Sequence, residues 1–187
     1  MKATWLTGML VGAALTCAPH QSLAQDKGKT AAAELAADSQ AALQQLTSSV
    51  PLAKAAAGSA HAILVFPKVT KAGLGVGGQY GEGTLLKKGT ATAYYKTTGA
   101  SFGLQAGGQQ YGYAMFFMNE KALTELDSAK GFEVGVGPSI VLADEGMAKT
   151  TTTNTIKEDI VAFVFGQKGL MAGLGIQGNK ITKITPK

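Results

Sequence analysis

The 187-residue sequence predicts an α+β fold, in which N-terminal helices pack on a strongly coiled antiparallel sheet or a partly closed barrel of short glycine-rich strands. The first reason is a change of apolar period, from about 3.6 residues before Gly58 to 2 residues after it. The second is that glycine alternates with apolar residues in four later segments. The third is the short spacing between the expected strands, which favours antiparallel hairpins over βαβ units.

Residues 1–24 have the pattern of a secretory signal peptide: Lys2 gives a positive start, residues 6–18 are apolar, and Ser22-Leu23-Ala24 is a small-x-small cleavage site. The apolar stretch is too short to cross a bilayer, which takes about 20 residues. We therefore expect an exported protein that is periplasmic or associated with the outer membrane. A lipoprotein anchored through Cys17 is the alternative, because the residues before this cysteine resemble a lipoprotein processing box.

The composition restricts the chemistry of the chain. Cys17 is the only cysteine, so cleavage after residue 24 would leave no thiol for a disulfide, a zinc site or a nucleophile. No arginine occurs, and an anion would therefore be bound by lysine ammonium groups and backbone N–H groups. With a net charge of +5, this composition favours a broad electrostatic surface over a tight phosphate pocket.

Three helices are expected. Residues 25–29 are polar and are expected to be disordered, and Thr30 can cap a helix over residues 31–48. A short helix over residues 51–57 has proline at its first position and ends before a glycine. A further helix over residues 120–128 follows an asparagine cap.

The first strand is expected at residues 63–66, where an apolar run ends at Pro67. Further strands are expected at residues 84–86, 91–97, 111–118 and 160–165, with turns at Gly99, Gly107, Gly108 and Gly166. The glycine alternations lie at residues 73–77, 102–104, 134–137 and 173–176. Glycine inside a strand is unfavourable unless another backbone approaches closely or the sheet bends sharply, so these segments indicate strong coiling. The threonine-rich residues 150–155 are expected to form an exposed edge strand or hairpin arm.

Two matches to the dinucleotide fingerprint G-x-G-x-x-G begin at Gly73 and Gly173. That motif binds pyrophosphate only where its third glycine opens a helix, and the residues after Gly78 and Gly178 do not favour one. We therefore expect no nucleotide cofactor.

Catalytic and metal sites are not expected either. His61 is the only histidine after residue 24, and it lies at the start of the first strand, where a structural role is common. The acidic pairs Asp144-Glu145 and Glu158-Asp159 have no histidine or cysteine beside them, although calcium at the first pair stays open. The sequence thus predicts a protein that is not an enzyme and has no cofactor.

Lysines are the leading candidates for a binding surface. They bracket the first strand and lie along the hairpin that follows it, so we expect several to gather on one side of the sheet. Near a charged membrane each lysine contributes on the order of 1 kcal/mol. The alternative is that these lysines protect sheet edges against aggregation. The candidate headgroup-binding residues are Lys54, Lys68, Lys71, Lys87, Lys88 and Lys96.

Four segments carry a resemblance to a known family, and they lie at residues 62–83, 93–109, 131–139 and 160–178. Together they resemble the SYLF domain, a lipid-binding family also described as the actin-binding domain of a yeast actin-patch protein. The first segment reads A-I-L-V-F-P-K-V-T-K-A-G-L-G-V-G-G-Q-Y-G-E-G and the last contains F-V-F-G-Q-K-G-L-M-A-G-L-G-I-Q-G. The resemblance covers about residues 51–184.

The resemblance implies a phospholipid-binding module over residues 51–187, preceded by a helical segment over residues 25–50. We expect non-enzymatic binding of anionic phospholipids at a membrane surface by an exported envelope protein, with no nucleic-acid partner. Two features differ from phosphoinositide-binding members: the chain lacks arginine, and its leader directs it out of the cytoplasm. The alternative is a protein-interaction or adhesion module of the cell envelope without lipid specificity.

Overall fold

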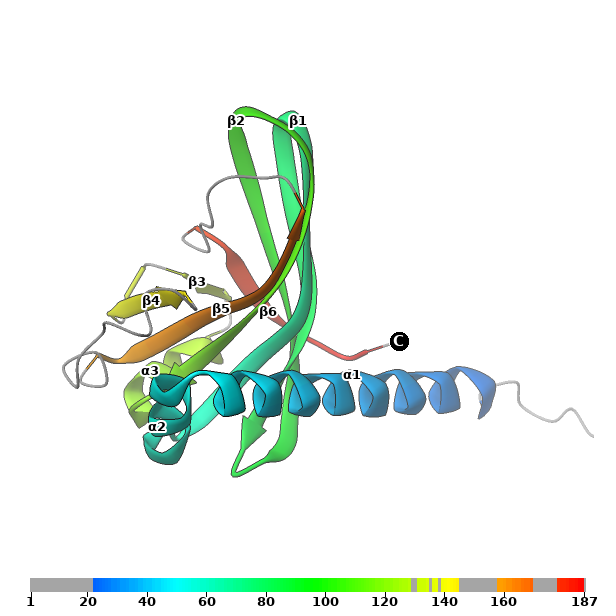
Figure 1. Ribbon diagram of the computed structural model, residues 1–187. Helices are drawn as coiled ribbons and strands as arrows, with labels where there is room; N and C mark the ends of the chain where they lie inside the picture. The colour runs from blue at the N-terminus through cyan, green and yellow to red at the C-terminus, as the bar shows by residue number, and fades with distance from the viewer. Residues whose placement is uncertain are drawn as a thin grey trace, which may run out of the picture.

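The computed structural model describes residues 22–128, 131–134, 136–137, 139–144, 158–169 and 178–186. Within these residues, N-terminal helices are followed by a strongly curled sheet that forms a half-barrel, as the sequence predicted (Figure 1). The elements are α1 (Ser22–Ser49), α2 (Pro51–Ser59), β1 (Ala62–Lys87), β2 (Thr90–Phe117), α3 (Glu120–Leu126), β3 (Phe132–Glu133), β4 (Ile140–Asp144), β5 (Ile160–Gly169) and β6 (Lys180–Ile184).

The helices form close to where they were predicted, except at the start of α1. This helix is continuous from Ser22, so residues 25–29 are helical and Thr30 lies inside the helix instead of capping it. The cause is the high helix propensity of the alanine-rich sequence, which lets the helix extend through a polar stretch. α2 has Pro51 in its first turn, and α3 is capped by Asn119, whose Oδ1 accepts a hydrogen bond from the Ala122 N–H at 2.9 Å.

β1 and β2 form one long antiparallel ribbon, with partners from Ala62 and Phe117 at one end to Lys87 and Thr90 at the other. The separate strands expected within it are merged, and Pro67 does not end the first of them. The ladder instead shifts register between Phe66 and Val69, which accommodates a residue that has no N–H to donate.

The turns expected at Gly99 and at Gly107-Gly108 are also wrong, because these glycines lie within β2. The tight turn of the ribbon is at Lys88 and Gly89, which both have positive φ angles, of 50° and 80°. These glycines stay in the strand because each has a ladder partner on β1: Gly99 pairs with Gln79, Gly107 with Gly73 and Gly108 with Ala72.

β2 is the strand on which the sheet is assembled. Its first half pairs with β6 and its second half with β5, while β1 pairs along both halves. β3 extends the sheet beyond β6, and β4 extends it beyond β5. The β4–β5 pair is parallel, which differs from the all-antiparallel pairing that the spacing predicted. The threonine-rich residues 150–155 and the alternation at 173–176 lie outside the described residues.

The ribbon bends back on itself, and its glycines permit the close approach of the two halves. A Cβ at Gly81 would lie 2.7 Å from Val69 Cγ2 and 2.8 Å from the Lys68 carbonyl oxygen. A Cβ at Gly83 would overlap the Val65 carbonyl oxygen and lie 2.6 Å from the ring of Phe66. The second half of β1 therefore packs directly against the first, which confirms the close approach that the glycine pattern predicted.

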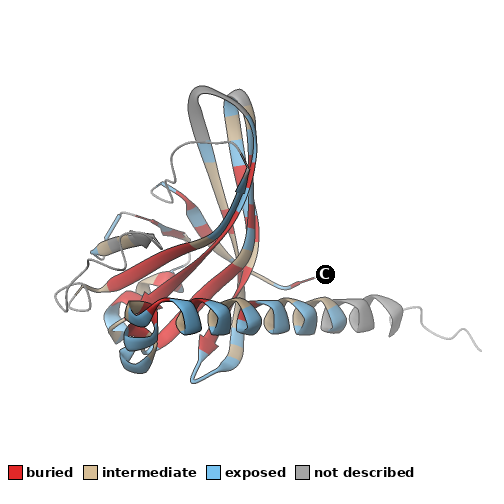
Figure 2. Cartoon of the chain, viewed as in Figure 1, coloured by how far each residue is buried: buried red, intermediate tan, exposed pale blue. Residues whose placement is uncertain are grey.

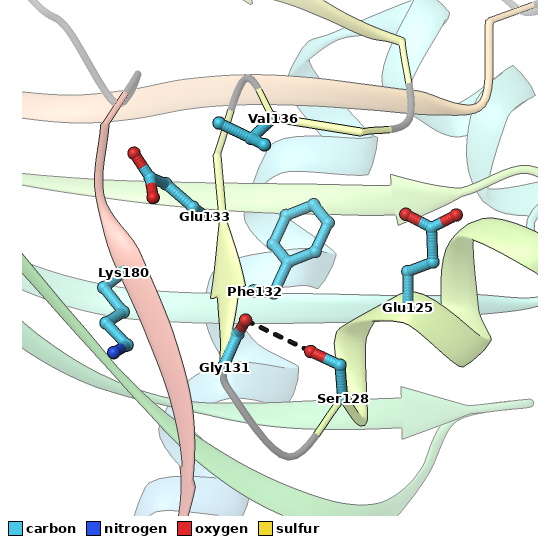
Figure 3. Close-up of a pocket in the computed structure, with 7 residues that line it drawn as sticks. All are labelled: Glu125, Ser128, Gly131, Phe132, Glu133, Val136 and Lys180. Atoms are coloured by element: carbon cyan, nitrogen blue, oxygen red, sulfur yellow. Dashed lines mark hydrogen bonds between the residues drawn. The ribbon is translucent and has the colours of Figure 1, made fainter.

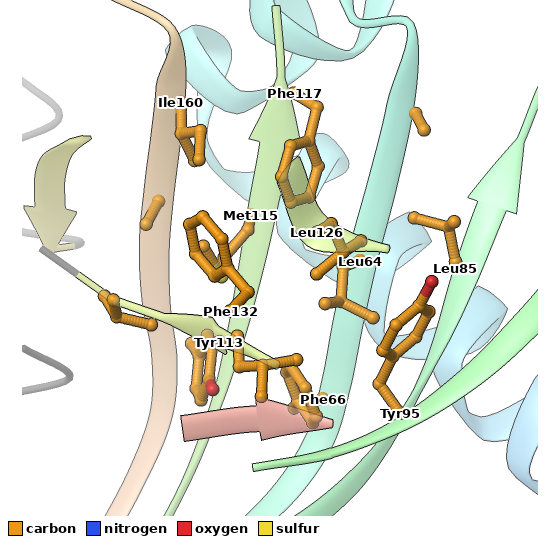
Figure 4. Close-up of a cluster of buried hydrophobic side chains, with 14 of the residues drawn as sticks. Leu64, Phe66, Leu85, Tyr95, Tyr113, Met115, Phe117, Leu126, Phe132 and Ile160 are labelled. Atoms are coloured by element: carbon orange, nitrogen blue, oxygen red, sulfur yellow. The ribbon is translucent and has the colours of Figure 1, made fainter. Parts of the chain in front are cut away.

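Two apolar clusters fill the two faces of this sheet. The first lies on what we call the inner face, where the halves of the ribbon meet and α3 and β3 close the space (Figure 4). It includes Leu64, Phe66, Leu85, Tyr95, Tyr113, Met115, Phe117, Leu126, Phe132 and Ile160. The second lies on what we call the helical face, between the sheet and the helices α1 and α2. It includes Leu46, Val50, Ala53, Ala56, Ile63, Val65, Leu86, Ala114, Phe116, Val161 and Phe163.

α1 crosses the ribbon near its hairpin turn, and part of it is exposed along its outer side (Figure 2). Ser39 and Thr84 are fully buried at this crossing, and the Ser39 hydroxyl donates to the Thr84 hydroxyl at 3.1 Å. The Thr84 hydroxyl donates to the Leu35 carbonyl at 3.3 Å, so both buried hydroxyl groups are satisfied. The Gln40 amide donates to the Gly89 carbonyl at 2.9 Å and joins the helix to the turn.

Replacement of Gly83 by alanine tests the close approach of the two halves of β1. The new methyl group must displace backbone or ring atoms, so Gly83→Ala should lower the free energy of unfolding by about 1–3 kcal/mol. The control is Gly58→Ala in α2, where a Cβ would meet nothing within 4 Å and should stabilise the protein by about 0.5–1 kcal/mol. Urea unfolding measures both values, and similar effects of the two substitutions would contradict the packing.

Candidate functional site

The structure distributes the six predicted lysines over several surfaces. Lys54 is exposed on α2, on the helical face of the sheet. Lys87 and Lys88 are exposed at the hairpin turn, and Lys68 is exposed where β1 shifts its register. These side chains do not form one cluster beside α2, because the ribbon separates the ends of the segments that carry them.

The other two predicted lysines are less accessible. Lys96 is half-buried on β2, and its register partner on β1 is Glu82. Lys71 is only 7% exposed, and it lies on β1 opposite Gln109. The strand period accounts for this burial, because Lys71 follows Val69 by two residues and so shares the inner face with it. The sequence interpretation missed it because it ended the first strand at Pro67.

A charged cluster that the sequence did not predict surrounds Asp127, just after α3. The Tyr95 hydroxyl donates to Asp127 Oδ1 at 2.6 Å, and Lys183 Nζ donates to the same oxygen at 3.0 Å. The Lys183 ammonium also lies 5.9 Å from the centre of the Tyr95 ring. The cluster links α3, β2 and β6, elements that are distant in the sequence.

The hydrogen bond from Tyr95, followed by the charges of Lys183 and Lys87, lowers the pKa of Asp127 below its ordinary value. Burial and the bond to this carboxylate raise the pKa of Tyr95. The Lys183 and Asp127 side chains are 60% and 50% exposed, and exposed pairs contribute at most about 1 kcal/mol. The cluster therefore holds the end of α3 against the sheet and has no arrangement suited to proton transfer.

A second unpredicted group is a buried chain of neutral polar side chains on the inner face. The Tyr111 hydroxyl donates to Gln79 Oε1 at 2.5 Å, and the Gln79 amide donates to Asn179 Oδ1. The Tyr113 hydroxyl donates to the Thr97 hydroxyl at 2.7 Å. Burial raises the pKa of Tyr111 to about 12, so this residue stays neutral under physiological conditions.

The pockets that the described residues form lie at the edge of the sheet. The larger, of about 380 Å³, lies among α3, β3 and β6, with Glu125, Glu133, Phe132 and Lys180 in its lining (Figure 3). A smaller one of about 210 Å³ lies on the other side of Glu125. The lining of the larger pocket also includes Ser128, whose hydroxyl donates to the Gly131 carbonyl at 3.1 Å, and neither lining contains a histidine.

Asp159, which lines the smaller pocket, is held in place by hydrogen bonds. Asn119 Nδ2 donates to its Oδ1 at 2.7 Å, and the Ser139 N–H donates to its Oδ2 at 3.0 Å. These bonds lower the pKa of Asp159, with the Asn119 contact the larger cause. Asp159 thereby connects the cap of α3 to the start of β4, which is a structural role.

The remaining candidates for chemistry are separated from one another. His61 is exposed just before β1, and its backbone N–H donates to the Phe117 carbonyl at 2.8 Å. Within the described residues, no group of three His, Cys, Asp or Glu side chains is arranged to hold a metal ion. Asp144 ends β4, and its neighbour Glu145 lies outside the described part. Likewise, no helix of the described part is long and apolar enough to cross a membrane.

The described part of the chain is thus a curled sheet with both faces packed and with exposed lysines on its surface. The family model Ysc84, described as Las17-binding protein actin regulator, matches residues 98–185, somewhat less than half of the chain. The match confirms the SYLF resemblance over these residues. SYLF domains are binding domains associated with lipids and actin.

No curated protein matches the chain. The span of the family model begins within β2, so the start of the domain at residue 51 and the segments before it stay predictions.

The Asp127 cluster makes stability depend on pH. Because the pKa of Asp127 is lowered on folding from 3.8, its carboxylate stabilises the protein above that pH, and the contribution is lost as the pH falls through the folded value. Asp127→Asn should therefore flatten the fall in the free energy of unfolding between about pH 5 and pH 2. The cost at pH 7 should not exceed about 1 kcal/mol, because the ion pair is exposed.

Denaturant unfolding over a series of pH values measures this effect. Lys183→Gln is the companion variant, since it leaves the carboxylate in place and removes one cause of the lowered pKa. If the free energy of unfolding of Asp127→Asn fell as steeply at acid pH as that of the unmodified protein, this result would contradict the role of the cluster.

Proposed function

We propose that this protein binds anionic phospholipids at a membrane surface and that it does so without catalysis, as an exported protein of the cell envelope. The observation that carries the proposal is a set of exposed lysines that form no ion pair with a carboxylate on the described surface. Lys183 and Asp127 form the one ion pair found among the described residues. Exposed lysines that form no ion pair there include Lys54, Lys68, Lys168 and Lys180.

The chemistry of these groups fits a lipid surface better than a single phosphate ligand. Lysine ammonium groups are point charges on flexible stems, and the chain has no guanidinium group that would hold a phosphate in bidentate geometry. Each lysine near an anionic surface contributes about 1 kcal/mol, and the contributions accumulate over many contacts. Binding of this kind depends on surface charge density and weakens as salt is added.

The expected place of action follows from the leader-like residues 1–24, which combine a positive start, a short apolar stretch and small residues at 22 and 24. We propose that cleavage there, or lipidation at Cys17, delivers the domain to the periplasm or the outer membrane. Anionic glycerophospholipids of the envelope are then the natural ligands. The lipid association of the SYLF family supports this assignment.

A second candidate is a protein-interaction module of the envelope. The description of the matching family names a protein partner, Las17, and an effect on actin regulation. A module of this kind would bind its partner in the absence of lipid. For this chain, its partner would be a protein of the envelope, because the leader directs it away from cytoplasmic actin.

Vesicle co-sedimentation tests the lipid proposal. The protein should sediment with vesicles that contain phosphatidylglycerol and stay in solution with pure phosphatidylcholine vesicles. Raising salt from about 0.05 M to 0.5 M should release most of the bound protein, because the Debye length falls from roughly 14 Å to roughly 4 Å.

Binding that is equally strong to both kinds of vesicle and indifferent to salt would contradict the electrostatic proposal. A stable complex with an envelope protein, formed without lipid and unaffected by vesicles, would favour the second candidate instead.

A further inference from the structure

The bend of the β1–β2 ribbon projects from the body of the molecule. Figure 1 shows both strands reversing at the top, at the end of the ribbon opposite α2 and the hairpin turn. In β1 the reversal lies between Gly73 and Gly77, since a Cβ at Gly73 would overlap Gly77 Cα and lie 2.7 Å from the Val76 carbonyl oxygen. β2 follows the outside of the same bend, with Phe102 and Ala106 as register partners of Val76 and Leu74.

This bend carries no charge on either strand. Between Lys71 and Glu82 in β1 every residue is neutral, and the same holds between Lys96 and Glu120 in β2. The residues in the sequence of the bend are glycine, alanine, leucine, valine, phenylalanine, serine and glutamine. A projecting segment without charged residues costs less free energy to transfer from water into a membrane, because no charged group has to be desolvated or paired.

Val76 shows that apolar surface is exposed at the bend. Its side chain is 65% exposed, and it is one of the few large apolar residues of the described part that face solvent. The antiparallel ladder runs up both sides of the bend, where Gly73 pairs with Gly107 and Gly77 with Ser101, and it shifts register at the bend between Leu74 and Val76. Backbone groups that bond across the ladder are already satisfied, which reduces the penalty for entering an apolar medium.

Positive charge lies at the base of the bend on two other strands. Lys168 on β5 is the register partner of Gln110, and Lys180 on β6 is the register partner of Thr98. Both lysines are exposed, and Lys180 has Glu133 as its own partner on β3. An uncharged tip with lysines at its base matches the layers of a membrane surface, in which the acyl region lies beneath anionic headgroups.

We propose that the ribbon bend inserts into one leaflet of an anionic bilayer, with Val76 at its tip and with Lys168 and Lys180 at headgroup level. From Thr98 to Leu104 the strand rises at most about 20 Å, at roughly 3.3 Å per residue, so the bend enters a leaflet without spanning the bilayer. The inference rests on the proposed lipid-binding function and adds the orientation of the domain. It places Lys54, Lys87 and Lys88 away from the membrane, at the other end of the ribbon.

The first test compares Val76→Asn with Val136→Asn in the full chain. Val136 is a matched control, because it is also valine, is 62% exposed and lies outside the ribbon. Neither substitution changes the net charge, so electrostatic attraction is preserved. Val76→Asn should weaken binding to phosphatidylglycerol vesicles roughly ten-fold, the loss expected for one valine that no longer enters an apolar medium. Val136→Asn should bind as the unmodified protein does.

The second test compares two variants that each remove two positive charges. Lys168→Gln combined with Lys180→Gln should weaken vesicle binding at low salt by about ten-fold or more, because both lysines would lie among the headgroups. Lys87→Gln combined with Lys88→Gln should change binding less than three-fold, since these residues would face the solvent. Circular dichroism and urea unfolding establish that all variants fold.

The outcomes separate this inference from the proposed function. If the unmodified protein binds anionic vesicles and Val76→Asn binds equally well, the bend does not insert, and the lipid-binding function stands. A stronger effect of the Lys87 and Lys88 pair than of the Lys168 and Lys180 pair would also overturn the orientation. If the unmodified protein does not bind anionic vesicles, both proposals fail.

Discussion

The architecture depends on the close approach of the two halves of β1. Gly81 and Gly83 lie against Val65, Phe66 and Val69 at distances that leave no room for a Cβ. With side chains at these glycines, the inner faces of the folded ribbon would separate. Tyr113 could then no longer reach Thr97, which lies on the other half of β2. The same fold-back that closes the inner face also creates the bend at Gly73 and Gly77, so core packing and the projecting tip have one structural cause.

Both faces of the sheet are occupied, and this directs function to the outside of the molecule. The inner face is filled by aromatic and aliphatic side chains and, toward the bend, by the hydrogen-bonded chain of Tyr111, Gln79 and Asn179. The helical face is covered by α1 and α2. What the described part leaves for a ligand is its surface: unpaired lysines, shallow edge pockets and an uncharged bend. A surface of this kind suits an extended partner such as a membrane better than a small enclosed molecule.

The sequence predicted the fold class because its glycine alternation and its change of period report local geometry directly. It did not predict that Pro67 and Gly99 lie inside continuous strands, since strand continuity depends on pairing between β1 and β2. The turn at Lys88 and Gly89 was missed because it lacks the usual Asn-Gly or Asp-Gly signal. For the site, residue types pointed to lysines, but the predicted end of the first strand at Pro67 hid the burial of Lys71 on the inner face. The contact between Gln79 and Asn179 spans 100 residues, so no local pattern encodes it.

Backbone hydrogen exchange with and without phosphatidylglycerol vesicles reports on each segment of the ribbon separately. If the uncharged, glycine-rich bend of the sheet meets an anionic membrane, vesicles should slow exchange at the bend, around Gly73 to Gly77 and the facing part of β2, and leave the turn at Lys88 and Gly89 unchanged. Protection confined to α2 and the hairpin turn, with unchanged exchange at the bend, would contradict insertion of the bend.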